Sequence, residues 1–201
     1  MNFNRFKSII AIATAAVLTL GACSNKAAKT QEGESEKTTD TKSLVCYFSA
    51  TGTTANAAKR LAALANADLH EIIPAQAYTD ADLDWRDSLS RSSVEMHNRH
   101  MRPTIADSIP NLKEYDIVYI GYPNWWNTAP TIINTFIEAN NLTGKVIAPF
   151  MTSGGSNITN SEKELQEAYP SLKWSKGLLM NSVSDDEITD WIASTQKQAA
   201  L

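Results

Sequence analysis

The chain has 201 residues, which is enough for one domain with a substantial hydrophobic core. Its formal net charge is −4 and no cluster of basic residues interrupts the sequence, so the composition argues against nucleic acid as a partner. With two cysteines, Cys23 and Cys46, the chain cannot be a small domain held together by several disulfides.

The first 22 residues have the pattern of a bacterial export signal. Arg5 and Lys7 give a basic start, and an uncharged run of small and apolar residues extends from Ile9 to Leu20. This run is too short to serve comfortably as a permanent membrane span. The ending Leu20-Gly21-Ala22-Cys23 resembles a bacterial lipobox, which implies cleavage before Cys23 and lipidation of its sulfur. The alternative is an ordinary signal peptide with a cysteine near its cleavage site.

Lipidation of Cys23 would leave Cys46 without a partner for a disulfide within the chain. Cys46 lies inside an apolar run, where a cysteine is usually a small buried hydrophobic residue. Residues 23–42 contain no large apolar side chain, so we interpret them as a lipidated cysteine followed by a flexible tether. Removal of residues 1–22 changes the balance from 18 basic against 22 acidic residues to 16 against 22, a net charge of about −6. The membrane would therefore be reached through the lipid and not through a cationic face.

From residue 43 to residue 201, apolar runs alternate with helical patterns. Strands are predicted at residues 44–48, 69–73, 117–122, 146–151 and 178–183. Helices are predicted at residues 54–65, in a stretch within 83–100, and at 129–139, 161–169 and 185–196. This alternation predicts an α/β domain with a doubly wound parallel sheet, helices on both faces and right-handed crossovers.

Capping signals predict where some helices begin. Ser161 precedes Glu164 in the pattern of a capping box, and Ser184 is followed by three acidic residues that a helix N-terminus favours. Four aspartates are interpreted as a solvated helix start, because the glycine and glutamate of a calcium-binding loop are missing: Asp80, Asp82, Asp84 and Asp87.

The stretch Ser49–Thr54 has the composition of a phosphate-binding turn. It follows the first predicted strand and precedes a helix, and it offers four hydroxyls and a glycine, Gly52, that lets the backbone approach a ligand. It contains no lysine or arginine, so it does not match the loop of a nucleotide-hydrolysing enzyme. We therefore predict that it anchors a phosphate that does not react. The alternative is an ordinary strand-to-helix turn capped by threonine.

Two further loops follow predicted strands. Pro123-Asn124-Trp125-Trp126 carries adjacent indoles that can stack on a planar ring, although the pair could instead pack under its own loop. Thr152-Ser153-Gly154-Gly155 has two glycines where the chain would approach a flat ligand. Ligands of open parallel sheets bind beyond the carboxyl ends of the strands, so the three loops together predict a mononucleotide-like cofactor.

Three motifs carry a resemblance to bacterial flavodoxin-like proteins of the exported, lipid-anchored kind: residues 48–54, 121–126 and 150–156. The resemblance covers about residues 43–198. It implies a five-stranded sheet in the order 2-1-3-4-5 and non-covalent binding of FMN. The implied phosphate ligands are Ser49, Thr51, Gly52, Thr53 and Thr54. The residues implied around the ring are Pro123, Asn124, Trp125, Trp126, Thr152, Ser153, Gly154 and Gly155.

The resemblance implies that the flavin carries the electrons, so no catalytic acid, base or nucleophile is expected from the protein. His97 and His100 lie in a polar region without a nearby cysteine and are not expected to bind a metal. Relatives often have glycine after the Trp-Trp pair, where this chain has Asn127. Asparagine tolerates the left-handed region better than most residues.

Three functions stay open at this level. The first is an FMN protein that passes electrons between redox partners at the cell envelope, anchored to a bacterial membrane by its lipid. The second is an FMN-dependent NAD(P)H or quinone oxidoreductase acting on a small molecule, for which residues 74–110 could supply extra walls over the flavin. The third is a flavin-free ligand-binding lipoprotein with the same fold.

Overall fold

The computed structural model describes residues 41–109 and 111–201. The predicted signal peptide, Cys23 and most of the predicted tether lie outside the described residues. Lys42, at the end of that tether, is already attached to the domain. Its backbone N–H donates to the carboxylate of Asp116 at 3.0 Å, and its Nζ lies 3.0 Å from Glu114 Oε2. The chain therefore joins the folded domain at this point.

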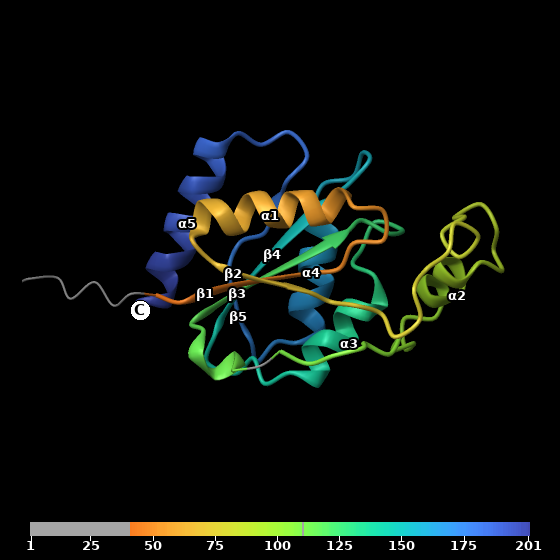
Figure 1. Ribbon diagram of the computed structural model, residues 1–201, viewed down its shortest axis with the longest axis horizontal. Helices are drawn as coiled ribbons and strands as arrows, with labels where there is room; N and C mark the ends of the chain where they lie inside the picture. The colour runs from red at the N-terminus through yellow and green to blue at the C-terminus, as the bar shows by residue number, and fades with distance from the viewer. Residues whose placement is uncertain (1–40, 110) are drawn as a thin grey trace, which may run out of the picture. The chain divides into compact units, whose positions relative to one another are not determined.

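Strands and helices alternate along the described chain, as predicted (Figure 1). The strands are β1 (Ser43–Tyr47), β2 (Asp68–Glu71), β3 (Ile117–Pro123), β4 (Val146–Thr152), β5 (Lys173–Trp174) and β6 (Leu178–Leu179). The helices are α1 (Thr53–Ala65), α2 (Arg91–His97), α3 (Thr131–Ala139), α4 (Thr159–Ala168) and α5 (Asp185–Ala199), with a 3-10 turn η1 (Leu112–Glu114).

The sheet is parallel and has the strand order β2-β1-β3-β4-β5, which confirms the predicted topology. In the register of the central strands, Cys46 of β1 lies beside Ile120 of β3, and Ile120 lies beside Pro149 of β4. All residues of β1 and β4 are buried, as are Ile117–Tyr122 of β3, whereas the edge strand β2 is largely exposed. This pattern is typical of a parallel sheet covered on both faces.

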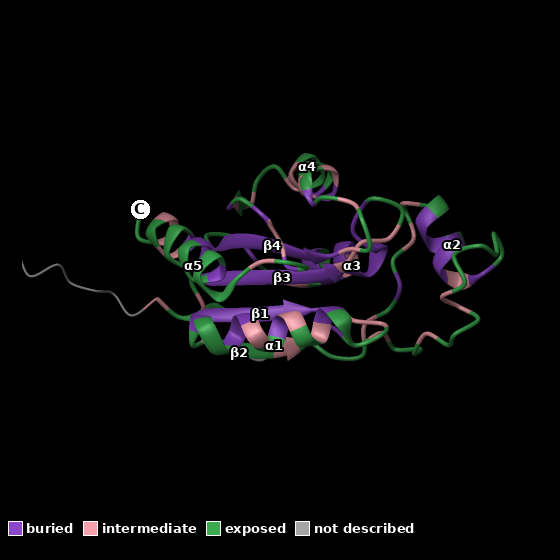
Figure 2. Cartoon of the chain, turned by 90° about the horizontal axis from the view of Figure 1, so that it is seen from above, coloured by how far each residue is buried: buried purple, intermediate pink, exposed green. Residues whose placement is uncertain are grey.

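Alternate residues of the central strands face opposite layers of helices. Leu44 and Cys46 belong to a hydrophobic cluster with α3 and α4, and Val45 and Tyr47 belong to a second cluster with α1 and α5. Figure 2 shows buried central strands between these helices. The doubly wound architecture is therefore confirmed. Cys46 is fully buried, and burial raises the pKa of its thiol well above the ordinary value.

The fifth strand differs from its prediction at residues 178–183, because it is divided into β5 and β6. β4 pairs with β5 through Ile147 and with β6 through Phe150, and Pro149 lies between these pairs. Proline has no backbone N–H, so one rung of the ladder cannot form there. Gly177 occupies the break, where an added Cβ would lie 2.8 Å from the side chain of Ile158.

One predicted helix cap is confirmed and the other is wrong. Ser184 caps α5, accepting from the N–H of Glu187 while the Glu187 carboxylate accepts from Ser184 in a reciprocal capping box. Ser161 lies inside α4, which begins two residues earlier. Its buried hydroxyl donates to the carbonyl oxygen of Ile158 and lies 3.1 Å from the hydroxyl of Tyr122. Ser161 is therefore part of the packing under α4 and not its N-terminal cap.

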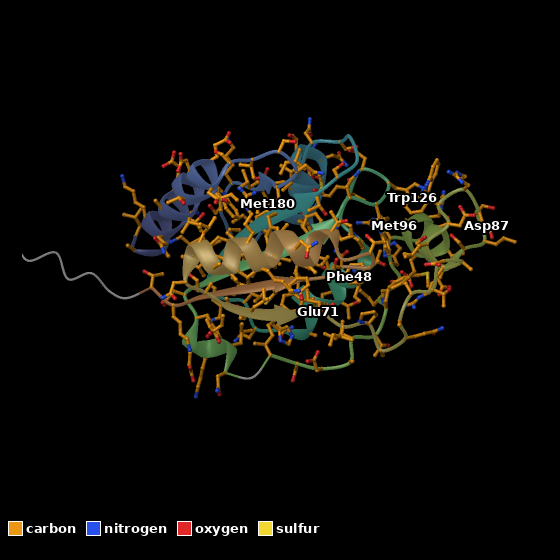
Figure 3. The ribbon with its side chains drawn as sticks, turned by 45° about the horizontal axis from the view of Figure 1, so that its top comes forward. Phe48, Glu71, Asp87, Met96, Trp126 and Met180 are labelled. Atoms are coloured by element: carbon orange, nitrogen blue, oxygen red, sulfur yellow. The ribbon has the colours of Figure 1, made fainter. Side chains whose placement is uncertain are left out.

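A long connection between β2 and η1 leaves the sheet as an excursion, residues 74–105. Its base is closed by an antiparallel bridge between Pro74 and Ile105. It contains α2, and Figure 3 shows Asp87 at its far end and Met96 closer to the sheet. The four aspartates do not start a helix, which corrects the prediction, since α2 begins later and is capped by Ser90. Three of them instead stabilise turns: Asp82 accepts from the N–H and hydroxyl of Thr79, and Asp84 and Asp87 each accept from a backbone N–H two residues later.

Candidate functional site

The loop between β1 and α1 presents hydroxyls and a helix N-terminus at the carboxyl edge of the sheet. Gly52 adopts a left-handed conformation with φ of 88°, and its N–H donates to Ser49 Oγ at 3.1 Å. The side chains of Thr51 and Thr53 are exposed. The first N–H groups of a helix have no partner within the helix, and the helix dipole makes this end positive. The loop can therefore hold an anion, although it has no cationic side chain.

Thr54 differs from its neighbours in the loop because it is buried, with 1% of its surface exposed. Its hydroxyl lies 2.7 Å from the hydroxyl of Thr152 at the end of β4. This hydrogen bond joins the first and third predicted loops. The hydroxyls that remain accessible to a ligand in the first loop are those of Ser49, Thr51 and Thr53.

The loop after β3 makes a tight turn that places the two tryptophans differently. The backbone N–H groups of Trp125 and Thr128 each donate to the other residue's carbonyl oxygen at 3.0 Å. The central residues Trp126 and Asn127 have φ values of 49° and 63°, which describe a type I′ turn. Asn127 thus adopts the left-handed conformation that its residue type tolerates. A bulky residue such as Trp126 rarely does so, and such strain is concentrated at functional sites.

Trp125 packs inward, whereas Trp126 keeps 39% of its surface exposed. The Trp125 ring makes edge contacts with Phe48 at 5.6 Å and Tyr78 at 5.4 Å between centroids. Trp126 makes an edge contact with the ring of His97, with 6.1 Å between the ring centroids. One tryptophan of the pair therefore packs within the domain, while the other keeps part of its ring accessible. Stacking of either indole on a planar ring stays a prediction.

Side chains of α4 hold the turn of the second loop. Asn160 donates from Nδ2 to the carbonyl oxygen of Asn127 at 3.0 Å. Thr128 donates from its hydroxyl to Glu164 at 2.6 Å, and Glu164 also accepts from Asn160. These contacts fix the turn that carries Trp126.

The third loop is tied to the segment after β6. Ser153 donates from its N–H to Asn181 Oδ1 at 2.7 Å, and Asn181 Nδ2 donates to the Ser153 carbonyl oxygen at 2.6 Å. Gly154 and Gly155 are exposed, and a Cβ added at either would meet no atom within 4 Å. Neither glycine has a positive φ, so the fold does not require glycine here. The open space above both residues suits the close approach of a flat ligand.

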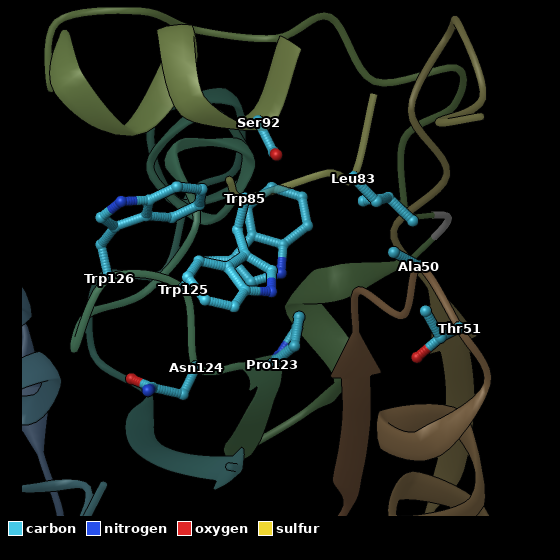
Figure 4. A pocket seen from close by; sticks show the side chains of 9 residues that line it. All are labelled: Ala50, Thr51, Leu83, Trp85, Ser92, Pro123, Asn124, Trp125 and Trp126. Carbon is cyan, nitrogen blue, oxygen red and sulfur yellow. The ribbon is translucent and has the colours of Figure 1, made fainter. Parts of the chain in front are cut away.

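A cavity of about 320 Å³ lies between the first two loops and the excursion (Figure 4). Of the predicted site residues, it is lined by Thr51, Pro123, Asn124, Trp125 and Trp126, together with Ala50. Thr152, Ser153, Gly154 and Gly155 do not line it, although the Asn124 N–H donates to the Thr152 carbonyl oxygen at 2.7 Å. The structure thus brings two of the predicted loops together around one cavity and places the third beside them.

Four lining residues were not predicted from the sequence: Ala50, which lies inside the first loop, and Leu83, Trp85 and Ser92, which come from the excursion. Trp85 is 67% exposed and stands in a stretch rich in aspartate and serine. A large aromatic residue in such a polar stretch was an available signal. Ser92 and Leu83 had none, because their position depends on how the excursion folds back over the sheet edge.

A buried polar network holds α2 against the aromatic cluster. Glu95 is 3% exposed and accepts hydrogen bonds from the Tyr78 hydroxyl at 2.5 Å and from Arg91 Nε at 2.7 Å. The guanidinium of Arg91 also lies 3.9 Å from the centroid of the Tyr78 ring. Burial, and then the hydrogen bond to Glu95, raise the pKa of Tyr78 well above its usual range. Through Tyr78, this network connects α2 to Trp125.

The described residues also bear on metal binding and on membrane spanning. Across residues 41–109 and 111–201 there is no cluster of side chains that could hold a metal ion. His97 is bound through Nδ1 to the Ser93 carbonyl oxygen at 2.6 Å and so has a structural partner. No helix in the described part of the chain is both long and apolar enough to cross a membrane.

The sequence and the fold are similar to those of known proteins. A family model described as flavodoxin matches residues 42–195. A candidate flavoprotein from Bacteroides eggerthii is 53% identical, with a TM-score of 0.75 over 77% of this chain and 97% of that one. One from Bacteroides uniformis is 54% identical, with a TM-score of 0.73 over 76% and 98%.

A more distant structure has the same fold. A flavoprotein from Lactobacillus acidophilus, solved in complex with FMN, is 22% identical, with a TM-score of 0.61 over 75% of this chain and 98% of that one. No curated protein matches the sequence. The family model covers most of the chain, and the strand order of the sheet is the one expected for this fold. The chain belongs to the flavodoxin family.

Proposed function

We propose that this chain binds FMN and transfers electrons at the bacterial cell envelope as a lipid-anchored flavodoxin. One observation carries the proposal: an anion-holding loop and a cavity walled by tryptophans meet at the same edge of the sheet. A mononucleotide with a phosphate at one end and a planar ring at the other has the matching chemistry. The family and the FMN complex of the Lactobacillus acidophilus flavoprotein support this choice of ligand.

Different loops of the site would bind different parts of FMN. The accessible hydroxyls of Ser49, Thr51 and Thr53 would donate hydrogen bonds to the phosphate, and the positive N-terminus of α1 would stabilise its charge. The loop 123–126 would border the ring, and Gly154 and Gly155 would let the backbone approach it. When bound, FMN would supply the capacity to accept and donate electrons, while the protein orients it and excludes water.

The cellular part of the proposal rests on the sequence. The lipobox-like ending at Cys23 supports lipidation, and the composition of residues 24–42 supports a tether between the lipid and the domain. Electrons would then pass to and from a redox partner protein or a small-molecule donor or acceptor near the membrane. The net negative charge argues against nucleic acid as a partner.

A second candidate function is that of an FMN-dependent oxidoreductase acting on a small molecule. The observation in its favour is the excursion, which adds Leu83, Trp85 and Ser92 to the walls of the cavity. Extra walls over a flavin are what a substrate pocket requires. Steady oxidation of NADH or NADPH with an added quinone would favour this enzyme over the carrier.

The primary test is the chromophore of the purified full-length chain. We expect a yellow protein with flavin absorbance that releases FMN on denaturation, identified by mass spectrometry. A colourless protein that does not take up added FMN would overturn the assignment and favour a flavin-free binding protein. Metabolic labelling with a radioactive fatty acid, compared between the native chain and Cys23→Ala, tests the anchor separately.

A further inference from the structure

Ser92 of α2 carries a polar group that the protein itself leaves unused. The residue is 2% exposed, and its Oγ has no hydrogen-bond partner within the described part of the chain. A buried hydroxyl without a partner costs free energy, so such groups are uncommon unless a ligand or water completes them. Figure 4 shows the Ser92 hydroxyl pointing into the cavity, on the side opposite Pro123 and Asn124.

The neighbourhood of Ser92 indicates what kind of partner is missing. The cavity is lined by three indoles, those of Trp85, Trp125 and Trp126, and none of its lining side chains carries a charge. Such walls favour the faces of a planar ring over an ionic group. Asn124, which also lines the cavity, has a buried Oδ1 without a partner in the described residues. Unused hydrogen-bonding groups therefore lie on both the excursion side and the sheet side of the same cavity.

We propose that Ser92 and Trp85 form a fourth cofactor-binding element, in which the Ser92 hydroxyl donates a hydrogen bond to an oxygen or nitrogen of the FMN ring system and Trp85 covers the ring. This inference rests on the proposed binding of FMN. It assigns a cofactor contact to the excursion, in addition to the three loops at the ends of β1, β3 and β4.

The backbone around Ser92 holds it in place for this role. Its N–H donates to the carbonyl oxygen of Asp82 at 2.9 Å, which connects α2 to the turn that precedes Leu83 and Trp85. Ser90 caps α2 by accepting from the N–H of Ser93. On the next turn of α2, Glu95 is anchored by Arg91 and Tyr78 as described above. Ser92 is therefore fixed by its neighbours, although its own hydroxyl has no partner.

Ser92→Ala separates a cofactor contact from a structural one. Removing an unpartnered hydroxyl should leave the thermal midpoint of the FMN-free protein unchanged or slightly raised. The same change should weaken FMN binding by about tenfold, the value of one hydrogen bond to the ligand. Ser92→Thr retains a hydroxyl and should restore most of the affinity. Ser88→Ala, at an exposed serine of the same excursion, is the matched control and should leave both quantities unchanged.

Trp85 is tested in the same way. Because its side chain is 67% exposed, Trp85→Ala should leave the thermal midpoint of the FMN-free protein within error. It should weaken FMN binding by about tenfold or more through lost stacking area. Leu89→Ala removes an apolar side chain that is 83% exposed on the same excursion and does not line the cavity, so it should leave FMN affinity unchanged.

The experiment is titration of the FMN-free full-length chain with FMN, followed by quenching of flavin fluorescence, with thermal unfolding of each variant measured in parallel. Weaker binding of Ser92→Ala and Trp85→Ala at unchanged apo-protein stability supports the proposal. Equal affinity of both variants and the native chain would overturn it while leaving FMN binding by the three loops intact. If the native chain itself does not bind FMN, the proposed function fails and this inference fails with it.

Discussion

The loops at the sheet edge and the excursion contribute to one cavity, but different forces place them there. The loops after β1, β3 and β4 come together because the carboxyl ends of parallel strands meet at one edge, and those strands are held by continuous backbone ladders. The excursion contains one helix of 7 residues, and a few side chains hold it in place. Glu95 binds Arg91 and Tyr78, and Arg99 donates to the carbonyl oxygen of Ala129 at 3.0 Å.

One binding site can therefore combine parts of unequal stability. A unit held by few buried contacts opens locally more easily than the core strands of a sheet. We therefore expect the excursion to open without unfolding of the sheet.

The largest effect is expected from Glu95→Ala. This change leaves Arg91 without its buried partner and the Tyr78 hydroxyl without its acceptor, at a cost of about 3 to 5 kcal/mol. Hydrogen exchange measured by mass spectrometry should show loss of protection in residues 78–97. The strands β1, β3 and β4 should keep theirs.

An exposed ion pair provides the control for Glu95. Glu167→Ala removes the partner of Lys163 on α4, where both side chains are largely exposed, and should change stability by less than about 1 kcal/mol. If Glu95→Ala lowered protection in the strands as much as in residues 78–97, the excursion and the sheet would form one cooperative unit. The excursion would then not open independently of the sheet.

A smaller effect is expected from adding one methyl group at two glycines. In Gly121→Ala, the new Cβ would lie 2.0 Å from the Phe150 ring, so overpacking should cost about 1 to 3 kcal/mol in chemical denaturation. In Gly154→Ala, the new Cβ meets nothing within 4 Å, and stability should stay the same. Gly154→Ala should instead weaken FMN binding, because the methyl group would occupy space over which the ring lies. Unchanged FMN affinity would remove Gly154 from the site.

The smallest effect on stability is expected at two threonines of the first loop, which we predict to have different roles. Thr54→Val removes the partner of the buried Thr152 hydroxyl and should cost about 1 kcal/mol in stability. Thr51→Val is at an exposed position and should leave stability unchanged while weakening FMN binding. Chemical denaturation and FMN titration of both variants measure the two quantities. Equal losses of stability would show that the loop acts as a single structural unit, contrary to the assignment.

Local patterns were sufficient to predict most of the sheet. Apolar runs identified β1, β3 and β4, and the serine followed by three acids at Ser184 identified the start of α5. The cap predicted at Ser161 was wrong, because a capping pattern inside a longer helix has the same residue types as one at its start. The fifth strand was also predicted wrongly, because Pro149 on the neighbouring strand interrupts the ladder. A partner strand distant in sequence leaves no local signal.

The alternation of strands and helices and the positions of the three loops could be predicted from the sequence, because each depends on residue types close together along the chain. The inward turn of Thr54 toward Thr152 depends on tertiary packing, and so does the difference in exposure between Trp125 and Trp126. The position of Ser92 at the cavity also depends on this packing. The physical reason is that burial and hydrogen-bond partners depend on contacts between segments far apart in the chain, which only packing brings together.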